Sequence, residues 1–397
     1  MDWFLLFIPF IAVIVAVLGF TRRFAIWEYA VLFSASALVV VAGHYMAANS
    51  LTSAKEYWGS YGVNAVHSER WNEYIHQTCT RENCSGSGEN RSCTTETYDC
   101  SYVDDHPEYW ELTDNMGDRH RISQHKYHEI TSKWKTEHHI KRHRGCHTIC
   151  GDVYGAAYPM SGDTTLANMI PLTTTHTYEN RVKASTSVFN FMKVDSLARV
   201  TYGLYDHPRV TDKFLDQPIL GINSAWASHK LRALNAINGS SRQLRMMIVV
   251  FEDKPYEAGL MQEAYWVGGN KNEFILVIGK KGDQIKWTKV ISWTEEIGLK
   301  MKVEREVKAM SKFNLVGIVD YMGSNVPMAW KRKSFKDFNY LKVEIPIGTV
   351  IWMAVINLVL TIGLMVFFIL NGVESHLHES THGRPKNRRR SDYYFRR

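Results

Sequence analysis

The hydrophobic residues are concentrated in three long runs, at residues 3–20, 29–47 and 347–370, and the chain between the last two runs is polar. A helix rises about 1.5 Å per residue, so about 20 apolar residues cross the hydrocarbon core of a bilayer. The pattern therefore predicts three transmembrane helices. A cleaved signal peptide is the alternative for the first run, although no basic residue precedes that run. A buried core helix is the alternative for the second run.

The short flanks of these runs predict how the chain crosses the membrane, because basic flanks stay in the cytoplasm. Arg22 and Arg23 lie between the first two runs, and the tail at residues 373–397 has seven Lys and Arg residues against three acidic residues. Both flanks therefore belong inside the cell. We expect the N-terminus and a central block at residues 49–344 to lie outside the cytoplasm, with a basic cytoplasmic tail.

These signals divide the chain into five segments. Residues 1–48 form the first two transmembrane helices, and residues 49–224 form a disulfide-stabilised, histidine-rich region outside the cytoplasm. An extracytoplasmic α/β unit follows at residues 225–344. The third transmembrane helix occupies residues 345–372, and the basic tail follows it.

The sharpest secondary-structure signals lie in the second half of the central block. Residues 245–251 are an apolar run typical of a buried strand, and residues 256–266 have a helical pattern. Residues 274–278 and 285–293 read as two further strands, joined by a glycine-containing hairpin at residues 279–283. This order predicts a small β-α-β-β sheet unit within an α+β ectodomain that three transmembrane helices anchor.

Weaker patterns predict further elements of the central block. The aromatic-rich residues 56–77 fit an interfacial belt, or a helix followed by a strand, and residues 77–103 read as β structure. Residues 123–137 predict a helix with its first serine as the N-cap. Residues 225–237 predict another helix, which ends near Gly239.

All six cysteines lie in the block that we expect outside the cytoplasm, which predicts disulfide bonds in an oxidising compartment. Six cysteines allow 15 pairings. A glycine- and serine-rich turn lies within two nested pairs of them, so a hairpin with two nested disulfides is favoured, and the last two cysteines are left as a small loop. The expected pairs are Cys79–Cys100, Cys84–Cys93 and Cys146–Cys150.

A histidine-rich stretch raises the possibility of a transition-metal site. His139 and His143 lie four residues apart and would share one helical face, and Cys146 and Cys150 would complete the ligand set if they were reduced. Basic residues within the same stretch repel a cation. Structural or surface histidines are therefore favoured over a metal site.

A second candidate site follows the first buried strand. Glu252 and Asp253 come directly after it, and Asn270, Asn272 and Glu273 precede the next strand. Carboxylate and amide oxygens suit a divalent cation such as Ca²⁺ or Mg²⁺, and ligands in open α/β sheets sit beyond the strand ends. The alternative, a solvated turn, is favoured, so we expect no cofactor beyond this possible cation.

Composition and motifs exclude several functional classes. An aromatic content of 12% is too high for a disordered chain. The net charge of +7 comes mostly from the tail, so the central block is nearly neutral and predicts no nucleic-acid partner. The sequence has no phosphate-binding loop, dinucleotide fingerprint, zinc-protease motif or nucleophile elbow.

The order of elements at residues 230–295, a strand, a helix and a strand in a membrane-anchored chain, is similar to that of TPM-type domains of bacterial envelope proteins. The wider chain resembles uncharacterised membrane-anchored proteins of tailed phages and bacteria. The stretch that carries this second resemblance is Gln262-Glu263-Ala264-Tyr265-Trp266-Val267-Gly268-Gly269-Asn270-Lys271-Asn272-Glu273-Phe274. The resemblance implies an envelope protein and no particular biochemical activity.

The sequence therefore favours an integral membrane protein whose disulfide-bonded ectodomain binds or scaffolds another envelope or membrane protein without catalysis. Its expected partners are the lipid bilayer and that second protein. The first alternative is a divalent-cation-dependent hydrolase of phosphatase type that uses Glu252 and Asp253. The second alternative is a metal-responsive membrane sensor that uses the histidine-rich stretch.

Overall fold

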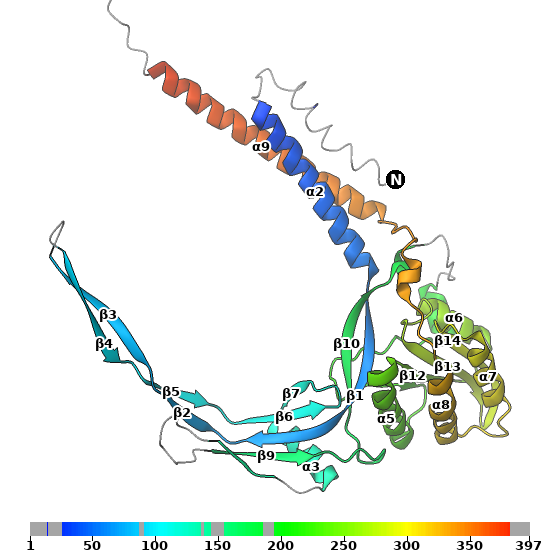
Figure 1. The fold of residues 1–397 in the computed structure, drawn as a ribbon. Coiled ribbons are helices and arrows are strands. Elements are labelled where there is room, and N and C mark those ends of the chain that lie inside the picture. Colours follow the sequence, from blue (N-terminus) through cyan, green and yellow to red (C-terminus); the bar gives the residue numbers. More distant parts are fainter. Residues whose placement is uncertain are drawn as a thin grey trace, which may run out of the picture. The chain divides into compact units, whose positions relative to one another are not determined.

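The computed structural model describes residues 14, 26–86, 91–135, 139–143, 155–185 and 194–381, with the backbone alone for residues 26 and 371–381. The chain forms two compact units, which are described separately (Figure 1). The helical unit consists of Met1–Ser53, Glu179–Asn190 and Lys336–Arg397. The sheet unit consists of Ala54–Tyr178 and Phe191–Phe335.

The helical unit contains two long helices, α2 (Ile26–Thr52) and α9 (Ile347–Thr381). They pack along each other in opposite directions. Leu32, early in α2, packs with Phe368, which is late in the apolar part of α9. Val40, further along α2, packs with Met353, which is close to the start of α9.

Two helices of the described chain are long and apolar enough to cross a membrane, at Trp27–Thr52 and Ile347–Leu370. They coincide with the second and third predicted runs. Tyr45 is 72% exposed and Trp352 is 68% exposed, so neither helix is enclosed as the core helix of a globular protein would be. The first run, at residues 3–20, lies outside the described residues except for Ile14, and its membrane span stays a prediction.

A buried polar cluster joins the two helices. The Ser36 hydroxyl donates to Asn357 Oδ1 at 2.9 Å, and Asn357 Nδ2 donates to the Ser36 carbonyl at 3.0 Å. The Thr361 hydroxyl donates to the Asn357 carbonyl at 2.8 Å. In apolar surroundings polar side chains must satisfy one another, so this cluster holds the helices in one register.

One short helical turn, η4 (Phe335–Phe338), precedes α9, and another, η3 (Arg181–Ala184), follows β10 in the sequence. The backbone N–H of Asn180, directly before η3, donates to the Thr52 carbonyl at the end of α2 at 2.6 Å. One of the unsatisfied carbonyls at the helix C-terminus is satisfied in this way.

The larger sheet of the sheet unit has the order β7-β6-β1-β9-β8, and β10 also pairs with β1. The helix that was one alternative for residues 56–77 is not formed, because β1 and β2 occupy most of this stretch and β1 takes partner strands along both edges. Its strands are β1 (Ser53–Ser68), β6 (Tyr109–Asp114), β7 (Arg119–Ile122), β8 (Lys141–His143), β9 (Gly155–Ser161) and β10 (Pro171–Glu179).

Helix α3 (Gln124–Trp134) covers the core of this sheet with Tyr127, Ile130 and Trp134, all buried. The predicted N-cap is confirmed, since Ser123 Oγ accepts a hydrogen bond from the backbone N–H of Lys126 at 3.2 Å. The helix ends earlier than expected because Lys135 adopts a left-handed conformation.

The smaller sheet has the order β11-β12-β13-β14, with the first three strands parallel and the last antiparallel. Alternate residues of β12 face opposite sides of the sheet. Met246, Ile248 and Val250 pack toward α5, α7 and α8, whereas Met247 and Val249 pack toward α6. Both faces are covered, which explains why β12 appears in the sequence as an unbroken apolar run.

These elements have the following bounds: β11 (Ile219–Leu220), β12 (Arg245–Glu252), β13 (Glu273–Lys281), β14 (Gln284–Ser292), α4 (Ser196–Tyr202), α5 (Ala225–Arg242), α6 (Glu257–Tyr265), α7 (Ile297–Lys308) and α8 (Leu315–Ala329). The predicted end of α5 near Gly239 is wrong. The helix continues to Arg242, and Gln243 ends it in a left-handed conformation. Gly239 instead allows close packing on β1, because a Cβ there would lie 2.3 Å from the Gly59 nitrogen.

Candidate binding site

Residues 71–106 leave the larger sheet and return to it as a long hairpin, which we call the arm. Two ladders build it: β2 (Trp71–Ile75) pairs with β5 (Tyr102–His106), and β3 (Thr78–Ser85) pairs with β4 (Ser92–Asp99). Figure 1 shows the second ladder continuing outward from the first. The β3–β4 register runs from Thr78 opposite Asp99 to Ser85 opposite Ser92 without a bulge.

The outer ladder of the arm has no hydrophobic core. Every residue of β4 is exposed, and in β3 only Cys79 is partly buried. An isolated two-stranded hairpin is marginally stable at best in water, because it buries too little apolar surface to offset the entropy of ordering its chain. Some other interaction must therefore hold the outer ladder together.

Two disulfides supply that interaction, Cys79–Cys100 and Cys84–Cys93. They are the two nested pairs that the cysteine spacing predicts. A cross-link removes conformations from the unfolded ensemble, so it stabilises a hairpin without needing a core. Cys146 and Cys150 lie outside the described residues.

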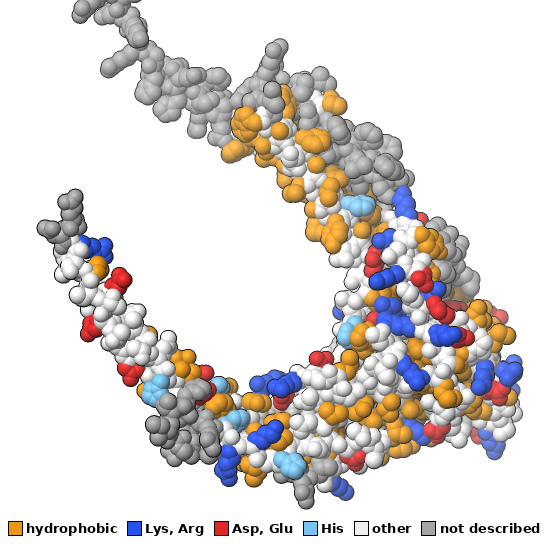
Figure 2. Space-filling model, viewed as in Figure 1, with side chains coloured by type: hydrophobic (Ala, Val, Ile, Leu, Met, Phe, Trp, Pro, Cys, Tyr) orange, Lys and Arg blue, Asp and Glu red, His pale blue; other side chains and the backbone are white. Residues whose placement is uncertain are grey.

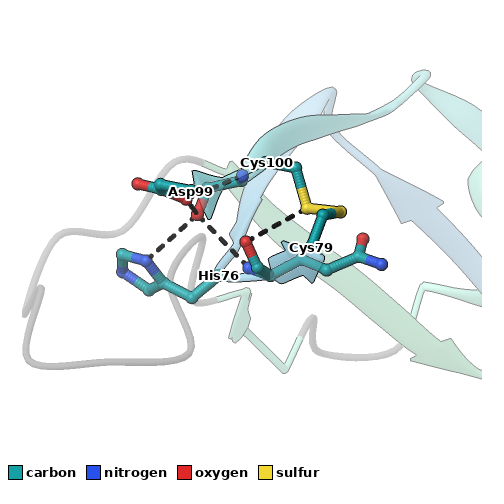
Figure 3. Close-up of a disulfide and its surroundings, with 6 residues drawn as sticks. His76, Cys79, Asp99 and Cys100 are labelled. Atoms are coloured by element: carbon teal, nitrogen blue, oxygen red, sulfur yellow. Dashed lines mark hydrogen bonds between the residues drawn. A yellow bond between two sulfur atoms is a disulfide. The ribbon is translucent and has the colours of Figure 1, made fainter. Parts of the chain in front are cut away.

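The Cys79–Cys100 disulfide lies where the two ladders meet (Figure 3). There the backbone N–H of Cys100 donates to the Gln77 carbonyl at 2.9 Å, and the Gln77 N–H donates to Ser101 Oγ at 3.2 Å. The Ser101 hydroxyl and backbone N–H both donate to Asp99, which lowers the pKa of that carboxyl. These hydrogen bonds connect the two strands of the hairpin in the short segment between its two ladders.

The base of the arm is fixed to the larger sheet by stacked rings. Trp71 of β2 stacks on His106 of β5 with ring centroids 3.9 Å apart, and on His143 of β8 with centroids 4.6 Å apart. His143 Nε2 also lies 3.0 Å from the hydroxyl of the buried Ser68. Burial lowers the pKa of His143, with a smaller contribution from the charge of His106.

This arrangement corrects the expected geometry of the histidine-rich stretch. Residues 139–143 are not helical, so His139 and His143 do not share a helical face. His139 donates its backbone N–H to the Pro159 carbonyl at 3.0 Å, and His143 stacks on Trp71. No cluster of three or more His, Cys, Asp or Glu side chains is placed to hold a metal ion in the part of the chain that the structure describes.

The middle of the arm carries exposed apolar side chains. Tyr98 and Tyr102 are each 49% exposed and Val103 is 57% exposed. Figure 2 shows hydrophobic side chains toward the base of the arm and both acidic and basic side chains further along it. Exposed aromatic residues on an element without a core are typical of a protein-binding surface, because they bury large areas when a partner docks.

The candidate cation ligands Glu252 and Asp253 are each paired with a lysine. Glu252 accepts hydrogen bonds from Lys280 Nζ and, at 2.9 Å, from the Gly282 N–H, which together lower its pKa. Asp253 lies 3.1 Å from Lys281 Nζ. The two carboxylates thus hold β12 against the β13–β14 hairpin.

The remaining candidate ligands lie at the opposite end of the sheet. Because β12 and β13 are parallel, Glu273 lies beside Arg245, whereas Glu252 lies beside Lys280. The expected grouping of Glu252 and Asp253 with Glu273 and its neighbouring asparagines is therefore wrong. In a parallel sheet, the C-terminal end of one strand and the N-terminal start of the next lie at opposite ends of the strands.

Glu273 belongs instead to a buried ionic network that the sequence analysis missed. Arg245 donates to Asp216 Oδ1 at 2.6 Å and to Glu273 Oε1 at 2.8 Å, and its guanidinium lies 4.8 Å from the centre of the Tyr57 ring. His207 Nε2 lies 2.9 Å from Glu273 Oε2. An arginine and a glutamate at the starts of two consecutive apolar strands were the available signal.

Electrostatics within this network favour the charged forms. Burial alone would raise the pKa of Glu273, but His207 and Arg245 outweigh burial, so the pKa lies below its ordinary value. Burial likewise opposes the charge on Arg245, and its two carboxylate partners outweigh that effect and raise its pKa. The side chains of Arg245 and Glu273 are 1% exposed or less, so the network supports the fold.

A comparison with known proteins found no matching family model, no matching curated protein and no matching solved structure. The resemblance to TPM-type domains and to phage and bacterial membrane proteins therefore stays a prediction. The functional interpretation rests on the geometry of the chain itself.

Proposed function

We propose that this chain is a membrane-anchored binding module whose arm, outside the cytoplasm, captures another protein of the cell envelope. Two apolar helices provide the anchor, and disulfides are typical of an oxidising compartment. In this proposal the helix at residues 3–20 is a third anchor, residues 49–344 lie outside and the basic tail lies in the cytoplasm. The smaller sheet serves as the β-α-β-β unit that supports the module.

The exposure of the cross-linked arm is the observation that supports this proposal most. Its outer ladder buries almost nothing, so the ladder adds little to the stability of the sheet unit. Two disulfides nevertheless keep it extended, and a tryptophan fixes its base. An element that is ordered without serving the core is best explained by what it contacts outside the molecule.

The hydrolase alternative has no observation in its favour. It requires a cation between Glu252 and Asp253, and each of these carboxylates is paired with a neighbouring lysine. The sensor alternative requires a metal at His139 and His143, and the structure gives His143 a stacking role. The binding module is therefore the function that the geometry of the arm supports best.

The proposal is tested by photo-cross-linking in intact membranes. A photoreactive residue replaces Tyr102 on the arm or, as a control, Tyr256, which is 44% exposed on the smaller-sheet side of the sheet unit. The expected result is a discrete cross-linked protein from Tyr102 that Tyr256 does not give. Replacing residues 79–100 with a short Gly-Ser turn should abolish capture at a second probe on Val103. Equal cross-linking from Tyr256, or capture that survives this deletion, would overturn the proposal.

A further inference from the structure

The outer ladder of the arm has two free edges. β3 and β4 pair with each other and with no other strand among the described residues. Each strand therefore presents a row of backbone N–H and C=O groups away from its partner, and such an edge is a template for a further strand.

The Cα spacing between paired residues of β3 and β4 shows which backbone N–H and C=O groups point away from the ladder. The Cα atoms of Cys84 and Cys93 are 4.0 Å apart. This spacing is typical of a non-hydrogen-bonded antiparallel pair, at about 4.5 Å, and not of a hydrogen-bonded pair, at about 5.5 Å. Counting in twos from Cys93, the N–H and C=O groups of Thr95 and Thr97 point outward from β4, and on β3 those of Thr80, opposite Thr97, do the same.

Three other edge strands among the described residues carry the usual protection against strand addition. β7 is four residues long and contains two arginines, and β8 is three residues long and contains a lysine and an arginine. β14 contains Lys286 and Lys289. Short length and basic side chains on an edge both discourage pairing with another chain.

The β4 edge has none of this protection. Ser92–Asp99 is eight residues long, pairs in unbroken register and contains no lysine, arginine or proline. Its threonines and tyrosine are residues with high β propensity. β3 differs because it contains Arg81. β4 is thus the long, regular and unblocked edge of the arm.

The charge on β4 indicates the chemistry of its partner. Its charged side chains are Glu96, which lies opposite Arg81 of β3, and Asp99, with Tyr98 exposed between them, so β4 itself carries only acidic charge. In a second copy of β4 paired residue for residue, Glu96 and Asp99 would face their own counterparts, and like charges directly opposite each other destabilise a cross-strand pair. An extended segment with lysine or arginine side chains matches the edge instead.

We propose that the arm binds its partner by strand addition, with a basic, extended segment of another protein hydrogen-bonding to the outward N–H and C=O groups of Thr95 and Thr97. This inference rests on the proposed binding role of the arm and goes further, because it names the edge and the kind of segment. Main-chain bonds give such a complex its affinity, and side chains on alternate positions give it selectivity.

The test uses the full chain in lipid nanodiscs and a fluorescent ten-residue peptide of alternating lysine and threonine. Thr97→Pro removes one outward N–H from β4 and leaves the inner ladder intact, since proline is tolerated at edge positions. Thr80→Pro makes the same change on the opposite edge and is the matched control. We expect fluorescence anisotropy to show binding at least about tenfold weaker in Thr97→Pro, a difference of about 1.4 kcal/mol, and unchanged binding in Thr80→Pro.

A second measurement removes any dependence on the folding of the variants. The same peptide with N-methyl groups on every residue cannot donate along either edge, and we expect it not to bind the unaltered chain. Equal binding of the N-methylated peptide, equal loss in both proline variants, or equal binding of a glutamate–threonine peptide would overturn the inference. Cross-linking from Tyr102 that persists alongside any of these results would show that the arm binds a partner by another route.

Discussion

The arm and the smaller sheet are both made of paired β strands, yet different interactions hold the strands of each together. β12 and β13 bury almost every side chain, and helices cover both of their faces. β3 and β4 bury almost none. Burial of apolar surface, at about 25 cal/mol per Å², holds the first pair, whereas covalent cross-links hold the second.

The difference teaches where function is to be sought. A strand that is buried on both faces is selected for packing, and its sequence is constrained by its neighbours inside the molecule. A strand that is exposed on both faces and still fixed in place is free of that constraint. The side chains and backbone edge of the arm are therefore available to a partner in a way that those of the smaller sheet are not.

The largest expected effect breaks the buried side of this comparison. Arg245→Leu leaves the carboxylates of Asp216 and Glu273 without their shared cation, and the loss of one partner from a buried ion pair costs about 3–5 kcal/mol. Chemical denaturation of the full chain, followed by tryptophan fluorescence, measures this loss. Arg81→Leu on the exposed arm is the control, and we expect a change within about 0.5 kcal/mol. Similar losses in both variants would contradict the contrast.

The next effect breaks the exposed side. A double Cys79→Ser and Cys100→Ser variant removes a cross-link that closes a loop of sequence separation 21, which is worth about 3 kcal/mol in the chain-entropy model. We expect the arm to lose order while the smaller sheet keeps its unfolding midpoint. Tryptic cleavage at Arg81 should become much faster, with no change in cleavage within β12–β14. A lowered midpoint of the sheet unit would show that the arm supports the core.

The sequence predicted well those features that depend on neighbours in the chain. Long apolar runs predicted α2 and α9, because a helix that crosses a bilayer needs about 20 apolar residues in a row. The cysteine spacing around a turn predicted both described disulfides, because a hairpin brings together positions at similar distances from its turn. Ser123 was recognisable as a cap because the hydrogen bond that it accepts comes from a residue three positions later.

Features that depend on distant contacts were not predictable in this way. Gly239 reads as a helix end, but it lies within α5 because β1 approaches it at Gly59. Glu273 reads as a ligand beside Glu252, but parallel pairing places it beside Arg245. The joint of Trp71 with His106 and His143 requires three strands that are far apart in the sequence. Local patterns record none of these partners.

Acid sharpens the comparison with an intermediate effect. The pKa of Glu273 is lower in the folded chain than in the unfolded chain, so the folded state binds fewer protons below about pH 5. Its contribution to stability is full at neutral pH, begins to be lost as the pH falls through the ordinary pKa of a glutamate, and is gone only below the folded pKa. We expect a loss on the order of 2 kcal/mol between pH 7 and pH 3 that Glu273→Gln does not show.

Asp99 on the arm provides the matched control for this measurement. Its pKa is also lowered, by hydrogen bonds from Ser101, but the group is fully exposed and screened by water. Asp99→Asn should therefore follow the same pH dependence of unfolding as the unaltered chain. A pH profile that is flattened by Asp99→Asn and not by Glu273→Gln would reverse the assignment.

The smallest effect compares one residue type in the two environments. Asn235 of α5 donates to the Met246 carbonyl at 2.9 Å and accepts from the Met246 N–H at 2.8 Å, which satisfies the β12 backbone where the short β11 does not reach. Asn83 on the arm donates to Glu96 Oε2 at 2.9 Å in full exposure. Asn235→Ala leaves two buried backbone groups unsatisfied and should cost about 1–3 kcal/mol, since such groups lose their hydration without gaining a partner.

In Asn83→Ala, the Glu96 carboxylate exchanges its hydrogen bond from Asn83 for one from water. We therefore expect a change below about 0.5 kcal/mol in the local stability of the arm. Hydrogen exchange of the arm amides measures it, with the amide of Met246 as the reference in the same experiment. Arm amides that exchange many times faster in Asn83→Ala would mean that side-chain bonds, and not the two disulfides, set the order of the arm. The arm would then belong on the same side of the comparison as the buried strands, and the argument from its exposure to a partner would lose its basis.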